Sequence, residues 1–276
     1  MGMGDGPRYD HRKCEYRNRT KDEANRMALP WKHAIVVGGS SGIGEELVKL
    51  LASGGCRVAA IARREAELRR VAESCGQPDN VLTFVHDVTC CEEVSALFQQ
   101  ICRELGGLDL IIYAAGIMPR ITPEEYSLEK DRAAIEVNFT GAVAWINQAA
   151  ERFGRAGDGT IVGISSVAGD RGRGGYPVYG ATKAALNTYL ESIRNRVGRL
   201  GVAVITVKPG PVDTPMTKGM SGLPMVASPA EVARTILLAA ARRARIVYVP
   251  WKWRPVMLII RAIPSFLFQR MKKLNS

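Results

Sequence analysis

Tyr179 and Lys183 have the residue types and the spacing to move a proton. Residues four apart share one face of a helix, so the phenol and the ammonium are expected to be neighbours. A free phenol has a pKa near ~10, which is too high for efficient proton transfer at neutral pH. Because an ammonium favours the phenolate, the pair predicts a tyrosine whose pKa is lowered. Ser166, at the end of the apolar run 161–164, is a third candidate, with Ser165 as its rival.

A glycine-rich turn lies far upstream of this pair. It follows the apolar run 34–37, which is typical of a buried parallel strand, and it precedes a helical pattern. Glycines let the backbone approach a pyrophosphate, and a helix N-terminus offers free amides and the positive end of a dipole. The sequence therefore predicts a phosphate cradle, formed by Gly38, Ser40, Ser41, Gly42, Ile43 and Gly44.

Apolar runs alternate with helical patterns along most of the chain, as in a doubly wound parallel sheet. Strands are predicted at residues 33–37, 57–62, 81–86, 108–113, 160–165, 202–208 and 246–249. Helices are predicted at residues 42–53, 65–74, 92–105, 128–153, 177–197 and 229–241. The predicted fold class is α/β, a single doubly wound, Rossmann-type parallel sheet of seven strands with helices on both faces. In such a sheet, ligands bind beyond the carboxyl ends of the strands.

Composition fits this class and argues against others. Of the 276 residues, 46% are apolar, which is enough for one α/β core. The six cysteines form no C-x-x-C pair, so we expect reduced cysteines, a cytoplasmic protein and no metal site. Nine basic residues and no acid lie between Arg242 and the C-terminus; they carry +9 of the net charge of +11. Because the positive charge is concentrated in this one segment, it argues against a nucleic-acid partner.

In their order along the chain, these motifs resemble those of the classical short-chain dehydrogenase/reductase family, over about residues 29–249. The stretch 114–116 and the loop 209–214 match further family motifs. The resemblance implies that the catalytic residues are Asn138, Ser166, Tyr179 and Lys183. It implies that the cofactor is held by the glycine turn and by Arg63, Arg64, Asp87, Val88, Ala115, Gly116, Asn138, Tyr179, Lys183, Pro209, Gly210, Val212 and Thr214.

The resemblance also implies a reaction, the transfer of a hydride between a nicotinamide and a carbonyl carbon. In the reductive direction Tyr179 is then the general acid and Ser166 bonds the substrate oxygen. Lys183 lowers the pKa of Tyr179 and holds the nicotinamide ribose, and Asn138 places a water in a proton relay. Two positions depart from the family pattern: Val37 replaces the usual threonine, and Tyr113-Ala114 replaces a pair of asparagines.

The residues after the second predicted strand bear on the choice of cofactor. An acid there bonds the ribose 2′-hydroxyl of NAD, whereas a basic residue pairs with the 2′-phosphate of NADP. Here Arg63 and Arg64 follow the strand, and Glu65 is the first acid. A guanidinium matches a phosphate in geometry and stays charged. We therefore expect NADP(H) to be favoured over NAD(H), the alternative being two solvated arginines that open a helix.

Residues 1–28, polar and mixed in charge, are predicted to be a disordered arm before a catalytic domain at 29–250. In the basic C-terminal segment 251–276, apolar runs are shorter than the ~20 residues that span a bilayer. Aromatic and basic residues alternate there, which suits a peripheral site on the inner, anionic face of the membrane. The alternative is a helix packed on the domain or on a partner in a homo-oligomer.

The segments 165–171 and 245–270 have a weaker resemblance to polyprenyl-phosphate 2-keto-pentose reductases, which implies a lipid-linked keto substrate. Methionines and other apolar residues in 216–227, where the family has a lid, also suit an apolar substrate. The expected function is an NADP(H)-dependent oxidoreductase that interconverts a carbonyl and a secondary alcohol on an apolar or lipid-linked molecule. The alternatives are a soluble reductase of small ketones and a non-catalytic, cofactor-sensing protein of the same fold.

Overall fold

Seven parallel strands form one sheet in the structure, a computed structural model that describes residues 29–122 and 124–271. The strands are β1 (His33–Val37), β2 (Arg57–Ala62), β3 (Val81–Val85), β4 (Leu110–Tyr113), β5 (Thr160–Ile164), β6 (Ala203–Pro209) and β7 (Ile246–Val249). Their order across the sheet is β3-β2-β1-β4-β5-β6-β7. The predicted fold class is confirmed. The arm predicted at 1–28 lies outside the described residues.

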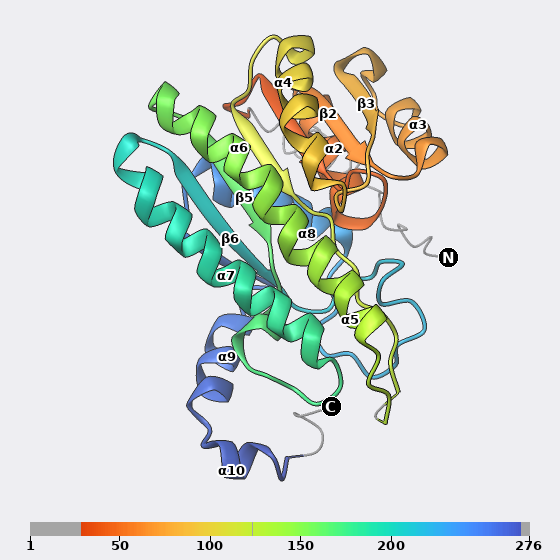
Figure 1. Cartoon of the computed structure of the whole chain (residues 1–276), viewed down its shortest axis with the longest axis vertical. Helices are drawn as coiled ribbons and strands as arrows, with labels where there is room; N and C mark the ends of the chain where they lie inside the picture. Colours follow the sequence, from red (N-terminus) through yellow and green to blue (C-terminus); the bar gives the residue numbers. More distant parts are fainter. Residues whose placement is uncertain (1–28, 123, 272–276) are drawn as a thin grey trace, which may run out of the picture.

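Helices cover both faces of the sheet (Figure 1). On one face lie α2 (Gly42–Ser53), α3 (Glu65–Glu73) and α8 (Pro229–Ala241), and on the other α4 (Val94–Leu105), α6 (Gly141–Ala156) and α7 (Pro177–Val197). Successive strand residues point to opposite faces, so Val36 packs under α2 and α8 while Ile35 packs under α4 and α6. Both faces are therefore buried, which explains the unbroken apolar runs in the sequence.

The helix predicted at 128–153 is confirmed, but it contains a π-helical bulge that the sequence did not predict. α5 (Leu128–Ile135) runs into a π-helical turn (Glu136–Thr140) before α6 begins. Inside this turn the carbonyl of Val137 accepts a hydrogen bond of 2.5 Å from the buried phenol of Tyr113. A Cβ at Gly141 would stand 2.8 Å from that phenol oxygen, so the glycine makes room for the phenol. π-bulges often occur at functional sites, and this one carries Asn138.

The hydrogen bond from Tyr113 to the carbonyl of Val137 also explains the two departures from the family pattern, at Val37 and Tyr113. Both side chains are fully buried in the cluster under α4, α6 and α7. Burial raises the pKa of Tyr113, so its phenol stays neutral and serves as a hydrogen-bond donor. Tyr113 thus supports the bulge from the sheet, while Val37 packs beside it and leaves no buried hydroxyl without a partner.

Two C-terminal helices, α9 (Trp253–Ala262) and α10 (Ser265–Phe268), lie at one end of the molecule beyond α7 (Figure 1). Trp253, Met257 and Ile260 recur at helical spacing, and with Phe268 and Val167 they form a small buried cluster. One face of residues 251–271 therefore packs on its own domain. None of the helices in the described part of the chain is long and apolar enough to cross a membrane.

A buried ion pair connects this end of the sheet to the loop after β5. The ammonium of Lys208, in β6, lies 2.5 Å from the carboxylate of Asp170 in a short 3-10 turn (Val167–Asp170). The same carboxylate accepts a hydrogen bond of 2.7 Å from Tyr248 in β7. The side chains of Lys208 and Asp170 are only 8% and 2% exposed, so water screens the pair little. This contact fixes the turn that follows Ser166 to the last two strands.

Candidate active site

A cavity of about 1170 Å³ opens at the carboxyl ends of the strands. Its lining includes every predicted site residue except Asp87 and Asn138. The structure therefore brings together the glycine turn after β1, the arginines after β2, the serine after β5, the Tyr179–Lys183 pair on α7 and the loop after β6. These residues meet at one edge because the strands are parallel, so that the carboxyl ends of all strands lie there.

The glycine turn has the shape of a phosphate cradle. Gly38 has a φ of +91°, and a Cβ there would lie 2.5 Å from the amide nitrogen of Ala115. A Cβ at Gly44 would overlap the carbonyl of Gly38. Among the described residues, no side chain caps the start of α2, because Ser41 makes no capping hydrogen bond. The first amides of α2 are thus free for an anion, so the turn fits the pyrophosphate of a dinucleotide.

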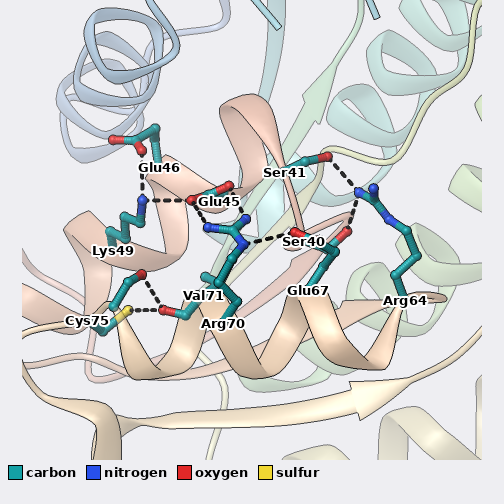
Figure 2. A network of polar contacts seen from close by, with 11 residues as sticks. Ser40, Ser41, Glu45, Glu46, Lys49, Arg64, Glu67, Arg70, Val71 and Cys75 are labelled. Atoms are coloured by element: carbon teal, nitrogen blue, oxygen red, sulfur yellow. Dashed lines mark hydrogen bonds and ion pairs between the residues drawn. The ribbon is translucent and has the colours of Figure 1, made fainter. Parts of the chain in front are cut away.

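The two arginines after β2 have different partners. Arg64 donates hydrogen bonds of 3.1 and 3.0 Å to the hydroxyls of Ser40 and Ser41, which brings its guanidinium to the rim of the cradle (Figure 2). Arg63 pairs instead with Asp87 at 3.4 Å. Asp87 also accepts two hydrogen bonds from Thr89, and its carboxylate lies outside the cavity lining. Arg64 is therefore the better placed of the two to receive a further phosphate.

A carboxylate near the cradle, Glu45 in the first turn of α2, is neutralised by two cations. Arg70 donates two hydrogen bonds of 2.9 Å to it, and Lys49 donates one of 2.7 Å (Figure 2). The Arg70 contact, with help from Lys49 and against burial, lowers the pKa of Glu45 to about 2. A carboxyl with a lowered folded-state pKa stabilises the protein at neutral pH, and that contribution is lost as the pH falls from 4.5 towards 2.

The two neighbouring serines after β5 point to different partners. Ser166 accepts a hydrogen bond of 3.0 Å from the amide of Ala168, and its hydroxyl hydrogen-bonds the phenol of Tyr179. Ser165 is buried and donates to the backbone carbonyl of Lys183 at 3.0 Å. Only Ser166 lies beside the phenol, so the alternation along the strand separates the two hydroxyls as expected.

The Tyr179–Lys183 pair differs from expectation in its electrostatics. Burial raises the pKa of Tyr179, and the hydrogen bond from Ser166 opposes the rise, so the predicted lowering by Lys183 is not observed. The ammonium of Lys183 lies 5.8 Å from the centre of the phenol ring and donates to the carbonyl of Ile164 at 3.0 Å. Burial lowers the pKa of Lys183 itself to about 8. The phenol thus stays protonated at neutral pH, the state that a proton donor needs.

Asn138 lies behind the cavity wall and is fully buried. Its side-chain amide exchanges two hydrogen bonds with the backbone of Ile117, of 2.7 and 2.9 Å, and donates a third to Thr182 at 3.2 Å. A Cβ at Gly116 would lie 3.3 Å from the amide oxygen and 3.4 Å from the ammonium of Lys183. Gly116 therefore lets Asn138 and Lys183 approach each other, beside the loop after β4.

The loop after β6 packs against both the cradle and the C-terminal helix. The methyl group of Thr214 faces Gly42, where a Cβ would be 3.1 Å away. A Cβ at Gly210 would overlap the indole of Trp253, so only glycine permits this contact with α9. Val212 and Ala227 form a bridge that closes the segment between them into a compact loop. The predicted site residues Pro209, Gly210, Val212 and Thr214 all lie in the lining.

Sequence reasoning missed one wall of the cavity, which is called the C-terminal wall because α9 forms much of it. Arg173 and Tyr176 contribute from the segment before α7, and Trp253, Val256 and Ile260 contribute from α9. The helical spacing of Trp253, Met257 and Ile260 was the available signal for a buried helix face. No local pattern indicates that this helix borders the site, because its position depends on long-range contacts with the 3-10 turn 167–170.

Comparison with known proteins agrees with this geometry. The family profile of the short chain dehydrogenases matches residues 32–222. An uncharacterized oxidoreductase of Staphylococcus epidermidis is 32% identical over 190 residues, or 68% of this chain and 81% of the relative. An uncharacterized oxidoreductase of Myxococcus xanthus is 29% identical over 242 residues, or 87% of this chain and 96% of the relative.

Solved structures give the same result. A short chain dehydrogenase/reductase family protein matches with a TM-score of 0.72 and 30% identity, over 80% of this chain and 97% of that one. The structure of ElxO with NADP bound matches with a TM-score of 0.74 at 21% identity, over 81% and 100% of the two chains, which shows a shared fold. The resemblance to the short-chain dehydrogenases/reductases seen in the sequence is confirmed, and the chain belongs to this family of oxidoreductases.

Proposed function

We propose that the protein is an NADP(H)-dependent oxidoreductase that interconverts a carbonyl and a secondary alcohol on an apolar or lipid-linked substrate. The observation that carries this proposal is the convergence of Ser166, Tyr179 and Lys183 on one cavity with the glycine cradle. The cradle fits a dinucleotide, and when bound the nicotinamide would supply or accept the hydride.

The side chains are arranged for proton transfer in the reductive direction. The phenol of Tyr179 gives its proton to the carbonyl oxygen, and the hydroxyl of Ser166 hydrogen-bonds the same oxygen as negative charge develops on it. The ammonium of Lys183 stabilises the phenolate that is left. Asn138 is buried and hydrogen-bonds the backbone of Ile117, so it would act from behind the cavity wall, holding the surroundings of Lys183 and placing the water of the expected proton relay.

The preference for NADP(H) rests on Arg64. We expect Arg64→Ala to raise the KM for NADPH about 10- to 100-fold and to change the KM for NADH little, because a charge-assisted hydrogen bond to a phosphate contributes about 1.5–3 kcal/mol. The measurement is the steady-state rate with each cofactor at a fixed substrate concentration. Arg69→Ala is the matched control, since Arg69 is exposed on α3 and pairs with Glu65. Equal losses with both cofactors would contradict the assignment.

The apolar nature of the substrate is supported by the residues that line the cavity beyond the cradle. The loop after β6 contributes Met216, Met220 and Leu223, and α9 contributes Val256 and Ile260. Methionines adapt to irregular apolar shapes. Because α9 borders the cavity on one side and the surface of the molecule on the other, an apolar molecule could reach the site along this helix.

The outer face of α9 and α10 supports peripheral binding to an anionic membrane. Trp251, Leu258, Ile259 and Phe266 are 71%, 70%, 66% and 62% exposed. Exposed cations lie among them, at Lys252, Arg254, Arg261 and Arg270. Acids are absent from this part of the sequence, so the surface complements a negatively charged leaflet, where each cation contributes about 1 kcal/mol. Exposed apolar and cationic residues on one face are typical of an interfacial helix.

Vesicle sedimentation tests this surface. We expect the protein to sediment with phosphatidylglycerol vesicles and much less with phosphatidylcholine vesicles. The double variant Leu258→Ser/Ile259→Ser should lose most of this binding, whereas Leu200→Ser, a substitution at an exposed leucine on another part of the molecule, should not. If the double variant instead abolishes a dimer in sedimentation equilibrium and leaves vesicle binding unchanged, the surface is an interface between two copies of the chain.

The substrate class is tested by following NADPH absorbance after adding a detergent-solubilised lipid extract or the matching aqueous extract, with Tyr179→Phe protein as the blank. We expect NADPH to be consumed with the lipid extract. Consumption with the aqueous extract alone would establish a soluble reductase of small ketones. Binding of NADPH without turnover on either extract or on a ketone panel would establish a cofactor-sensing protein.

A further inference from the structure

Two polar groups in the C-terminal wall of the cavity have no partner within the described residues. The Nε atom of Arg173 and the indole Nε1 atom of Trp253 are both buried and make no hydrogen bond there. Both residues line the cavity, but the indole nitrogen faces the backbone of Gly210, which leaves Arg173 as the candidate donor to a ligand. A buried donor without an acceptor costs free energy, more so when it carries a charge, so such groups in a binding site indicate a ligand that accepts their hydrogen bonds.

Arg173 is held in place without being neutralised. A terminal guanidinium nitrogen lies 4.0 Å from the sulfur of Met257, one helical turn beyond Trp253 on the same buried face of α9. No carboxylate of the described chain forms an ion pair with Arg173, and burial lowers its pKa. Other arginines near the site are already engaged: Arg63 with Asp87 and Arg120 with the carbonyl of Lys218. Arg173 is therefore a partly buried cation, with a fully buried Nε atom, in an apolar wall.

We infer that this wall binds an anionic group, a carboxylate or a phosphate, on the substrate, and that Arg173 is the residue that selects it. The inference rests on the proposed function, since it concerns the substrate of the same site. The apolar part of the substrate would contact Val256 and Ile260, which border the same wall. A guanidinium in such surroundings binds an anion well, because water competes little for it.

The test measures binding rather than turnover. Three probes with the same chain, decyl phosphate, decanoate and 1-decanol, are titrated calorimetrically into protein saturated with NADP+, so that the cradle cannot take the phosphate. We expect at least one of the two anions to bind about 10- to 100-fold more tightly than 1-decanol. Arg173→Met should remove this difference and leave the Kd for 1-decanol within about twofold, while Arg173→Lys should keep part of it.

Arg120→Met is the matched control, since Arg120 lines the same cavity but already donates to Lys218. Circular dichroism of each variant checks that it is folded. Equal affinity of the wild-type protein for all three probes, or an anion preference that survives in Arg173→Met, would overturn the inference. A parallel assay of NADPH oxidation with neutral 2-decanone tests the proposed function separately, because this ketone carries no anion.

Discussion

Replacing Tyr179 with phenylalanine should lower the rate of carbonyl reduction by at least about 10²- to 10⁴-fold, because a positioned general acid contributes that much. The substitution removes only the hydroxyl group of Tyr179, and the ring that packs beside Lys183 remains. The affinity for NADPH, measured by fluorescence titration, should stay within about twofold. Near-normal turnover of Tyr179→Phe would show that another group donates the proton.

Two comparisons sharpen this expectation. Ser166→Ala should also lower the rate strongly, whereas Ser165→Ala should lower it much less, because Ser165 bonds the backbone of Lys183 rather than the phenol.

The dependence of the reduction rate on pH should reflect the ionisation of Lys183. Its pKa is lowered to about 8 by burial, so the ammonium loses its charge, and its ability to stabilise the phenolate, as the pH rises through 8. Reduction should therefore decline above pH 8 while Tyr179 is still protonated.

The sequence predicted the sheet, and the meeting of the glycine turn with Ser166, Tyr179 and Lys183 at one edge of it, because these depend on local patterns and on strand order. Strands buried on both faces are continuous apolar runs, and a glycine-rich stretch between such a run and a helical pattern marks the turn, in which Gly38 has a positive φ. Parallel strands all end at one edge, so residues that follow different strands could be expected to meet there before any contact was known.

What the sequence could not predict depends on contacts between distant segments. The π-bulge around Asn138 replaces a regular helix because the phenol of Tyr113 reaches in from β4, 24 residues before Val137. The pKa of Tyr179 rises instead of falling because burial, which no spacing reveals, outweighs the hydrogen bond from Ser166. Likewise, the Nε atom of Arg173, which has no partner within the described residues, is found only when α9 is packed beside it.

Replacing Asp170 with asparagine should destabilise the protein by about 3–5 kcal/mol, the largest stability effect that we expect from a single polar substitution. Lys208 would keep its charge in a site where it is only 8% exposed, and its one carboxylate partner among residues 29–122 and 124–271 would be gone. Breaking a buried ion pair by removing one partner leaves the other charge uncompensated, which is the reason for the large cost. Urea unfolding monitored by circular dichroism at pH 7 measures the loss.

Two control variants separate the charge from the packing. Tyr248→Phe removes one hydrogen bond to the same carboxylate and should cost only about 1.5 kcal/mol, because the ion pair survives. The double variant Asp170→Leu/Lys208→Met replaces both charges with apolar groups and should recover most of the stability lost in Asp170→Asn. A cost below about 1 kcal/mol for Asp170→Asn would mean that water or another group compensates Lys208.

The position of this ion pair gives it a consequence for the site. Asp170 ends the 3-10 turn that begins beside Ser166, and Tyr248 precedes the helix whose residues Trp253 and Ile260 wall the cavity. Loosening the pair should therefore affect the substrate side more than the cradle. Folded Asp170→Asn protein at low temperature should bind NADPH normally but show a raised KM for the carbonyl substrate. A loss of NADPH affinity equal to the loss for the substrate would show that the ion pair supports the whole fold rather than the wall.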